Sequence, residues 1–167
     1  METVRVFIVN LGYYNQGKTT GKWFTPPLYP DAIAEQLELK NDSEEYAIHD
    51  YEAPFEIDRF DSIDEINRKY AALERLEEYD FGADVSALIG EWFRDIEELA
   101  ENAEDIVIYK GVSDMAELAQ DAVESGAVFG DLPDQVIAYL DFEALGRDME
   151  IEGNYLVTNS AIYEYAN

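Results

Sequence analysis

Residues 62–76, SIDEINRKYAALERL, decide the fold class of the middle of the chain. Ser62 and Glu65 have the spacing of a capping box, in which a serine hydroxyl and a glutamate three residues later satisfy free N–H groups of a first helical turn. Apolar side chains then recur at helical spacing, at Ile63, Ile66, Tyr70, Leu73 and Leu76. The stretch therefore predicts an amphipathic helix with its own start signal.

A second helical pattern follows, and Asp84 predicts its start. Its apolar side comprises Val85, Leu88, Ile89, Trp92 and Phe93, with Ile96 and Leu99 extending the pattern. Four acids fall together on the opposite side, Asp84, Glu91, Asp95 and Glu98. We therefore expect residues 62–103 to form a central helical domain with an acidic outer face.

The segment before this middle mixes strands with a helix. Alternation of apolar residues at positions 4–8 predicts a strand, and residues 21–25 and 45–50 predict two more. Pro30 and Asp31 predict the start of a short helix that carries Ile33 and Leu37. Residues 1–61 are therefore expected to form a small antiparallel sheet with one helix.

The last segment is also mixed. Residues 106–109 predict a strand, and residues 155–157 and 161–163 predict a closing hairpin. Between them, Ser113 and Asp114 begin a helix that ends at Gly126, and Pro133 begins another. The sequence therefore predicts an α+β fold of three small domains in a row, residues 1–61, 62–103 and 104–167.

The net charge of the chain is extreme. There are 38 Asp and Glu against 11 Lys and Arg, a formal charge of −27 in 167 residues. A disordered acidic chain is excluded because 47% of residues are hydrophobic and 13% aromatic, which is ample for a core. The three segments carry 12 acids and 5 bases, 12 and 4, and 14 and 2, so the excess lies on folded elements throughout. The obvious partner is a protein built to hold something equally negative.

One stripe of acids imitates a phosphate backbone most directly. Asp114, Glu117, Asp121 and Glu124 share the outer face of the helix that begins at Ser113, about 4.5–6 Å apart along its axis. No Lys or Arg on that helix neutralises them. On the scale of duplex DNA, 27 charges correspond to roughly 46 Å of axis, or about 90 Å for a dimer. A solvated helix face, halophilic adaptation and calcium binding are the alternative interpretations, although no Gly-containing acidic loop supports the last.

Residues 12–19, GYYNQGKT, match the phosphate-binding loop pattern and follow a predicted strand. This motif needs a helix behind it, because the helix N-terminus and the loop amides hold the phosphates. The next residues, TGKWFTPP, are poor helix formers and favour a strand and turn. A glycine-rich hairpin loop is the favoured interpretation, and a nucleotide-binding enzyme is the alternative.

Other catalytic or metal-binding patterns are sparse. The chain has no cysteine, which excludes disulfides and thiolate metal sites, and His49 is its only histidine. We expect no catalytic residues, no cofactor and no metal. The N-terminus lacks a basic region followed by a long apolar run, so the chain is expected to be cytoplasmic, without membrane contact.

Several blocks resemble the ArdA antirestriction family along essentially the whole chain. These blocks are residues 6–15 with Gly17, residues 21–24, residues 44–52 with Pro54 and Phe55, residues 104–108, Asp114 and Met115, and residues 139–148. The IHDYE run at 48–52 and the GRD run at 146–148 are the most specific. The resemblance implies a protein of mobile genetic elements that inhibits type I restriction–modification enzymes in a bacterial host.

The resemblance also implies an architecture and a mechanism. Family members consist of three small domains, dimerise through the C-terminal one, and form a long curved rod that mimics bent duplex DNA. They occupy the DNA-binding groove of the methyltransferase core, have no catalytic site and bind no nucleic acid. The eight acids named above are the candidate partner-binding residues, and inhibition of another basic DNA-binding protein is the alternative function. A strip around Val128, Phe129, Leu132, Pro133 and Val136 is either a dimer interface or core.

Overall fold

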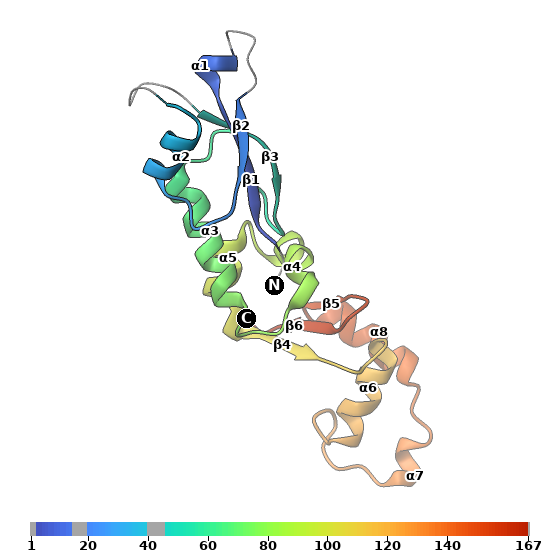
Figure 1. The fold of residues 1–167 in the computed structure, drawn as a ribbon. Coiled ribbons are helices and arrows are strands. Elements are labelled where there is room, and N and C mark those ends of the chain that lie inside the picture. The colour runs from blue at the N-terminus through green and yellow to red at the C-terminus, as the bar shows by residue number, and fades with distance from the viewer. Residues whose placement is uncertain (1–2, 15–19, 40–45, 167) are drawn as a thin grey trace. The chain divides into compact units, whose positions relative to one another are not determined.

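The computed structural model describes residues 3–14, 20–39 and 46–166 (Figure 1). They divide into two compact units, Met1–Glu101 (unit 1) and Asn102–Asn167 (unit 2). Both units contain helices and a three-stranded antiparallel sheet, which confirms the predicted α+β class. The division into three domains stays a prediction.

The sheet of unit 1 has the strand order β2-β1-β3, with β1 at Arg5–Asn10, β2 at Gly21–Phe24 and β3 at Tyr46–Glu52. Val6 and Ile8 are fully buried while Arg5 and Phe7 are half-buried, as the alternation in the sequence predicts. A short helix, α1 at Leu11–Tyr14, follows β1, and α2 at Pro30–Gln36 lies beside the sheet (Figure 1). The buried Asn10 side chain donates from Nδ2 to the Leu37 carbonyl at 3.1 Å, which joins the end of β1 to the end of α2.

The rest of unit 1 is helical. In α3, Ile63–Leu76, both bonds of the capping box are present: Glu65 N–H donates to Ser62 Oγ at 3.2 Å, and Ser62 N–H donates to Glu65 Oε2 at 2.7 Å. A 3₁₀ turn, η1 at Gly82–Asp84, precedes α4 at Val85–Trp92, and α5 at Ile96–Glu101 lies alongside α3 (Figure 1). The side chains of Ile66, Leu88 and Leu99 are fully buried between these helices.

The single helical pattern expected from Asp84 to Leu99 is wrong, because the helix stops at Trp92. Phe93 has extended backbone angles, φ −127° and ψ 154°, and a new helix begins at Ile96. Asp95 explains the break, since its Oδ1 accepts the Glu98 N–H at 2.8 Å, while the Glu98 carboxylate accepts the Arg94 N–H at 2.8 Å. The first bond satisfies a free N–H group in the first turn of α5, and the second holds the backbone just before that turn.

Unit 2 has the strand order β4-β6-β5, with β4 at Ile106–Tyr109, β5 at Tyr155–Val157 and β6 at Ile162–Tyr165. A 3₁₀ turn, η2 at Ala103–Asp105, precedes β4. The β5–β6 pair confirms the predicted hairpin, with Thr158 N–H donating to the Ala161 carbonyl at 3.0 Å in the turn.

Three helices lie between β4 and β5, namely α6 at Met115–Glu124, α7 at Asp134–Ile137 and α8 at Phe142–Glu152. The first two were predicted, and Gly126 ends α6 with φ 76° as expected of a helix C-terminus. α8 was not predicted. It packs against α6 at Gly146, where an added Cβ would lie 2.4 Å from the Met115 carbonyl oxygen.

Candidate partner-binding surface

Two carboxylates of the acidic stripe on α6 accept hydrogen bonds from backbone N–H groups at the start of the helix. Asp114 is the N-cap, and its Oδ1 accepts the Glu117 N–H at 2.9 Å. Glu117 Oε2 in turn accepts the Ser113 N–H at 2.7 Å. Both carboxylates therefore lie at the helix N-terminus, where the free N–H groups and the helix dipole favour negative charge.

The structure brings all four predicted residues of this stripe onto one exposed surface. Asp114, Glu117, Asp121 and Glu124 are exposed, and the helix contains no Lys or Arg. Glu124 Oε1 accepts a hydrogen bond from Gln120 Nε2 at 2.8 Å, which orients the carboxylate without cancelling its charge. The stripe is thus a row of ordered carboxylates without a neutralising cation on its own helix.

The sequence interpretation missed a second acidic helix surface, on α8. Asp141 caps this helix by accepting the Ala144 N–H at 3.0 Å, a signal that could have been read from its position before Phe142. Unit 2 as a whole has 14 acids and two bases, Lys110 and Arg147. At most two of its acids can therefore pair one-to-one with a base of the same unit. The exposed acids associated with α8 are Asp141, Glu143, Asp148, Glu150 and Glu152.

The four predicted acids of unit 1 do not share one helix face. Asp84 belongs to η1, Glu91 is exposed on α4, and Asp95 and Glu98 form the start of α5. Glu98 also pairs with Arg94, 3.0 Å from Nε to Oε2, and the pKa of Glu98 is lowered mainly by the Arg94 backbone N–H. Two of the four carboxylates thus cap a helix, and they were assigned to a common acidic face only because α4 and α5 were taken as one.

Ion pairs hold several further acids of unit 1. Arg5 makes two bonds of 2.6 Å to Glu52 while its guanidinium lies 4.6 Å from the ring centre of Trp23, and the Arg5 bonds lower the pKa of Glu52. Lys69 Nζ lies 2.6 Å from Asp61 Oδ2. Arg68 Nε lies 3.4 Å from Glu97 Oε1. These pairs reduce the field that the acids of unit 1 present to solvent.

The apolar strip of unit 2 is mostly at the surface. Val128 and Leu132 are half-buried, whereas Pro133 is exposed, Val136 is 45% exposed and Phe129 is 63% exposed. Tyr139 and Ile151, which the sequence interpretation did not single out, are 91% and 75% exposed. The loop that carries α7 extends from the packed α6–α8 pair (Figure 1). Unit 2 therefore has apolar as well as acidic side chains at its surface.

A phosphate-binding loop at residues 12–19 would need a helix shortly after it, but the structure has a strand at Gly21–Phe24. Residues 15–19 of the motif lie outside the described residues. Beyond them, Gly21–Phe24 is β2 and pairs with β1 in antiparallel register, Phe7 opposite Trp23. The helix N-terminus that would hold a phosphate is thus not formed at residues 21–24.

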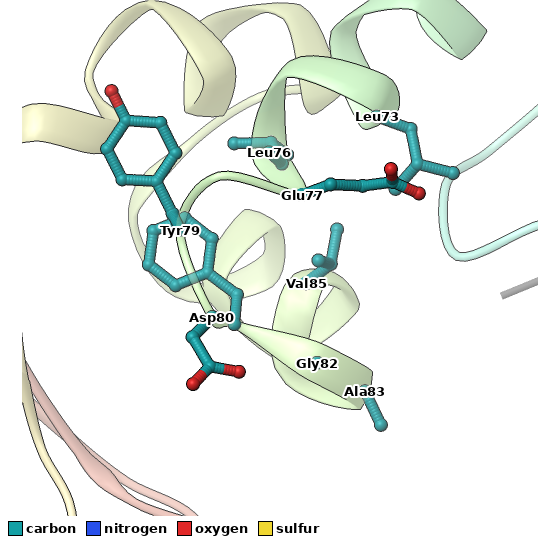
Figure 2. Close-up of a pocket in the computed structure, with 9 residues that line it drawn as sticks. Leu73, Leu76, Glu77, Tyr79, Asp80, Gly82, Ala83 and Val85 are labelled. Atoms are coloured by element: carbon teal, nitrogen blue, oxygen red, sulfur yellow. The ribbon is translucent and has the colours of Figure 1, made fainter. Parts of the chain in front are cut away.

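The cavities differ in the groups that line them, and one in unit 1 is lined by His49, Asp50, Tyr51 and Arg59 among others. Another, of about 520 Å³, is lined mainly by apolar side chains, including Leu73, Leu76 and Val85, and Figure 2 shows the carboxylates of Glu77 and Asp80 pointing to opposite sides of it. Among the described residues there is no group of three or more side chains suited to a metal ion. No helix in this part of the chain is long and apolar enough to cross a bilayer.

Two tyrosines of unit 2 share one carboxylate. Tyr109 donates its hydroxyl to Glu164 Oε2 at 2.6 Å, and burial together with Glu164 raises the pKa of Tyr109. The same causes raise the pKa of Tyr155 to about 12. Both phenols are therefore protonated at neutral pH and link the three strands of the sheet.

The described residues thus define an α+β protein with a surface rich in exposed acids. The family described as antirestriction protein (ArdA) matches residues 6–164. The chain therefore belongs to the ArdA family of antirestriction proteins, an inhibitor family. Among curated proteins, none matches the chain.

Proposed function

We propose that this protein blocks type I restriction–modification enzymes by occupying their DNA-binding groove in place of duplex DNA. Membership of the antirestriction family supports the general role. The observation that carries the mechanism is the α6 stripe, four exposed carboxylates on a helix without a cation. Its intended site of action is the cytoplasm of a bacterium, where such enzymes meet incoming DNA.

Electrostatics explains how an acidic protein can compete with DNA. A groove that holds DNA through Lys and Arg gains affinity by releasing counterions, and exposed carboxylates at phosphate-like spacing gain from the same source. With a net charge of −27, the inhibitor repels DNA itself, so its partner is the enzyme and not the nucleic acid. Without base edges to present, it must be recognised through its shape and the spacing of its charges.

We further propose that two copies associate through unit 2. Phe129, Val136 and Tyr139 expose apolar area that a second copy could cover. A dimer doubles the charge to a quantity equivalent to roughly 90 Å of duplex axis. Light scattering with the Phe129→Ser variant tests this, since the exposed ring can be removed without opening the core, and loss of the dimer is expected.

Competition at fixed salt tests the proposed function. Purified type I enzyme is bound to a labelled target duplex, and the protein is titrated in. Displacement near stoichiometry is expected, and direct binding of the protein to the enzyme should weaken as salt rises, because that binding gains affinity from counterion release. Absence of displacement at low salt would contradict the proposal and leave another basic DNA-binding protein as the candidate target.

Single charge removals on α6 should have small effects. Glu117→Gln is expected to weaken inhibition two- to fivefold, since one exposed charge contributes about 0.5–1 kcal/mol. Gln120→Ala is the matched control, because it removes the hydrogen bond to Glu124 but no charge. Complete loss of inhibition in Glu117→Gln would contradict a distributed mechanism.

A further inference from the structure

Phe60 is an exposed aromatic residue on the surface of acidic unit 1. Its side chain is 73% exposed, more than that of Trp23 at 39% or Tyr29 at 65%. It lies in the short loop before α3, between two aspartates, Asp58 and Asp61. A ring in such a position contributes little to the core and is accessible to a partner.

The loop that carries the ring is fixed by its neighbours. Phe60 N–H donates to Asp58 Oδ1 at 3.0 Å, and Asp58 N–H donates to Asp61 Oδ2 at 2.9 Å. Asp61 is held in turn by Lys69, with side chains that are only 14% and 19% exposed. Because the backbone is already ordered, little conformational entropy remains to be lost when the ring meets a partner.

Arg59 adds a second recognition group beside the ring. Its guanidinium carbon lies 5.5 Å from the centre of the Phe60 ring, and its carbonyl accepts the Ile48 N–H at 3.0 Å, which ties the loop to β3. Aromatic residues and arginines on rigid supports are the groups that most often dominate protein–protein binding energies. The pair therefore has the composition of a protein-binding anchor.

We propose that Phe60, backed by Arg59, is an aromatic anchor that fills an apolar pocket in the basic DNA-binding surface of the target enzyme. This inference rests on the proposed function. Exposed carboxylates of Glu56, Asp58 and Asp64 surround the anchor in sequence and complement a basic rim. Enzymes that modify DNA bases hold an extruded base between aromatic or apolar walls, so a groove of this class contains a socket of the required kind.

The anchor predicts a loss of affinity that does not depend on salt. Phe60→Ala should weaken binding of the full-length protein to the purified enzyme by more than tenfold at every salt concentration, leaving the salt slope unchanged because no charge is lost. Phe60→Trp should retain most of the affinity. Tyr29→Ala is the matched control, since it removes a similarly exposed ring from the same unit and should bind like wild type.

Several results would overturn the anchor. Affinity of Phe60→Ala equal to wild type would do so, as would a changed oligomeric state, which would assign the ring to a contact between copies. A photoreactive benzoylphenylalanine at position 60 should crosslink to the modification subunit, and crosslinking only to another copy would refute the proposal. Failure of the wild type itself to displace duplex would instead refute the proposed function, so the two failures are distinguishable.

Discussion

The two units reach a strongly acidic composition in different ways. Unit 1 carries 24 acids and nine bases, whereas unit 2 carries 14 acids and two bases. In unit 1, Arg5, Arg68, Lys69 and Arg94 are all within 4 Å of a carboxylate. In unit 2, most acids cannot have a cation of their own unit as a partner.

This contrast indicates that acids have different tasks in the two units. Acids cap helices in both units, but in unit 1 four of them also form ion pairs with bases of the same unit, namely Glu52, Asp61, Glu97 and Glu98. Those on α6 and α8 leave their charge exposed at a cost in self-repulsion. Exposed acids that repel one another are best explained by a basic partner that binds them. This comparison can be tested separately in each unit.

The largest expected effect is on binding by unit 2. Replacing all four stripe acids, as Asp114→Asn, Glu117→Gln, Asp121→Asn and Glu124→Gln together, should weaken inhibition about 100-fold. This follows if each exposed charge contributes about 0.5–1 kcal/mol and the terms roughly add. Asn at position 114 retains the helix cap, so folding should be preserved. The measurement is the duplex competition at fixed salt.

A matched set in unit 1 serves as the control. Asp64, Glu74, Glu77 and Glu78 are exposed acids of α3 and the residues just after it, on a segment that also carries Arg68, Lys69 and Arg75. Neutralising these four should weaken inhibition less than tenfold. Equal losses from both sets would show that only total charge matters and would remove the distinction between the units.

The next prediction concerns stability and compares alanine substitutions of two glycines, one in each unit. Gly146→Ala should destabilise unit 2 by about 1–3 kcal/mol, because the new methyl group meets the Met115 backbone, which cannot move aside as a side chain could. Gly90→Ala, inside α4 of unit 1 with nothing within 4 Å of the added Cβ, should stabilise by about 0.5–1 kcal/mol. Urea unfolding followed by circular dichroism measures both, and a neutral Gly146→Ala would contradict the close helix approach.

Local signals allowed most of the fold to be predicted. The Ser62–Glu65 capping box, the alternation in β1 and the β5–β6 hairpin are each encoded within a few neighbouring residues. The end of α4 was missed because the apolar pattern continues through Phe93, while the decisive Asp95 cap gives a weaker signal. α8 was missed although Asp141 before Phe142 gives a local N-cap signal, whereas its close contact with α6 at Gly146 is a tertiary feature that periodicity does not reveal.

The same limit applies to the proposed binding surface. The α6 stripe was predictable because one uninterrupted helix orders its acids. The unit 1 set was not, because whether Asp95 and Glu98 face solvent or cap a helix depends on where that helix begins. Phe60 could not be distinguished from core by residue type alone, and its exposure emerges only when the loop is folded.

Helix caps provide a smaller, paired test. Ser62→Ala in unit 1 and Asp114→Ala in unit 2 both remove an N-cap acceptor, which typically costs about 1 kcal/mol. Asp114→Ala also removes one of several unneutralised charges, so its net cost should be lower than that of Ser62→Ala. Amide hydrogen exchange in α3 and α6 can compare the two losses of stability. A larger loss for Asp114→Ala would contradict the view that repulsion between acids destabilises unit 2.

The smallest expected effect is the pH dependence of one exposed ion pair in unit 1. The Arg5 bonds lower the pKa of Glu52 below its usual 4.5, so the pair stabilises the folded state above that pH and the contribution is lost as pH falls through the lowered pKa. The difference in unfolding free energy between wild type and Glu52→Gln should therefore be constant near neutrality and shrink below pH 4.5. Both tryptophans, Trp23 and Trp92, lie in unit 1, so their fluorescence reports this unit during urea unfolding. If this difference in unfolding free energy stayed constant down to pH 3, Glu52 would act through packing. The Arg5–Glu52 pair would then no longer support the view that acids of unit 1 stabilise it as ion-pair partners.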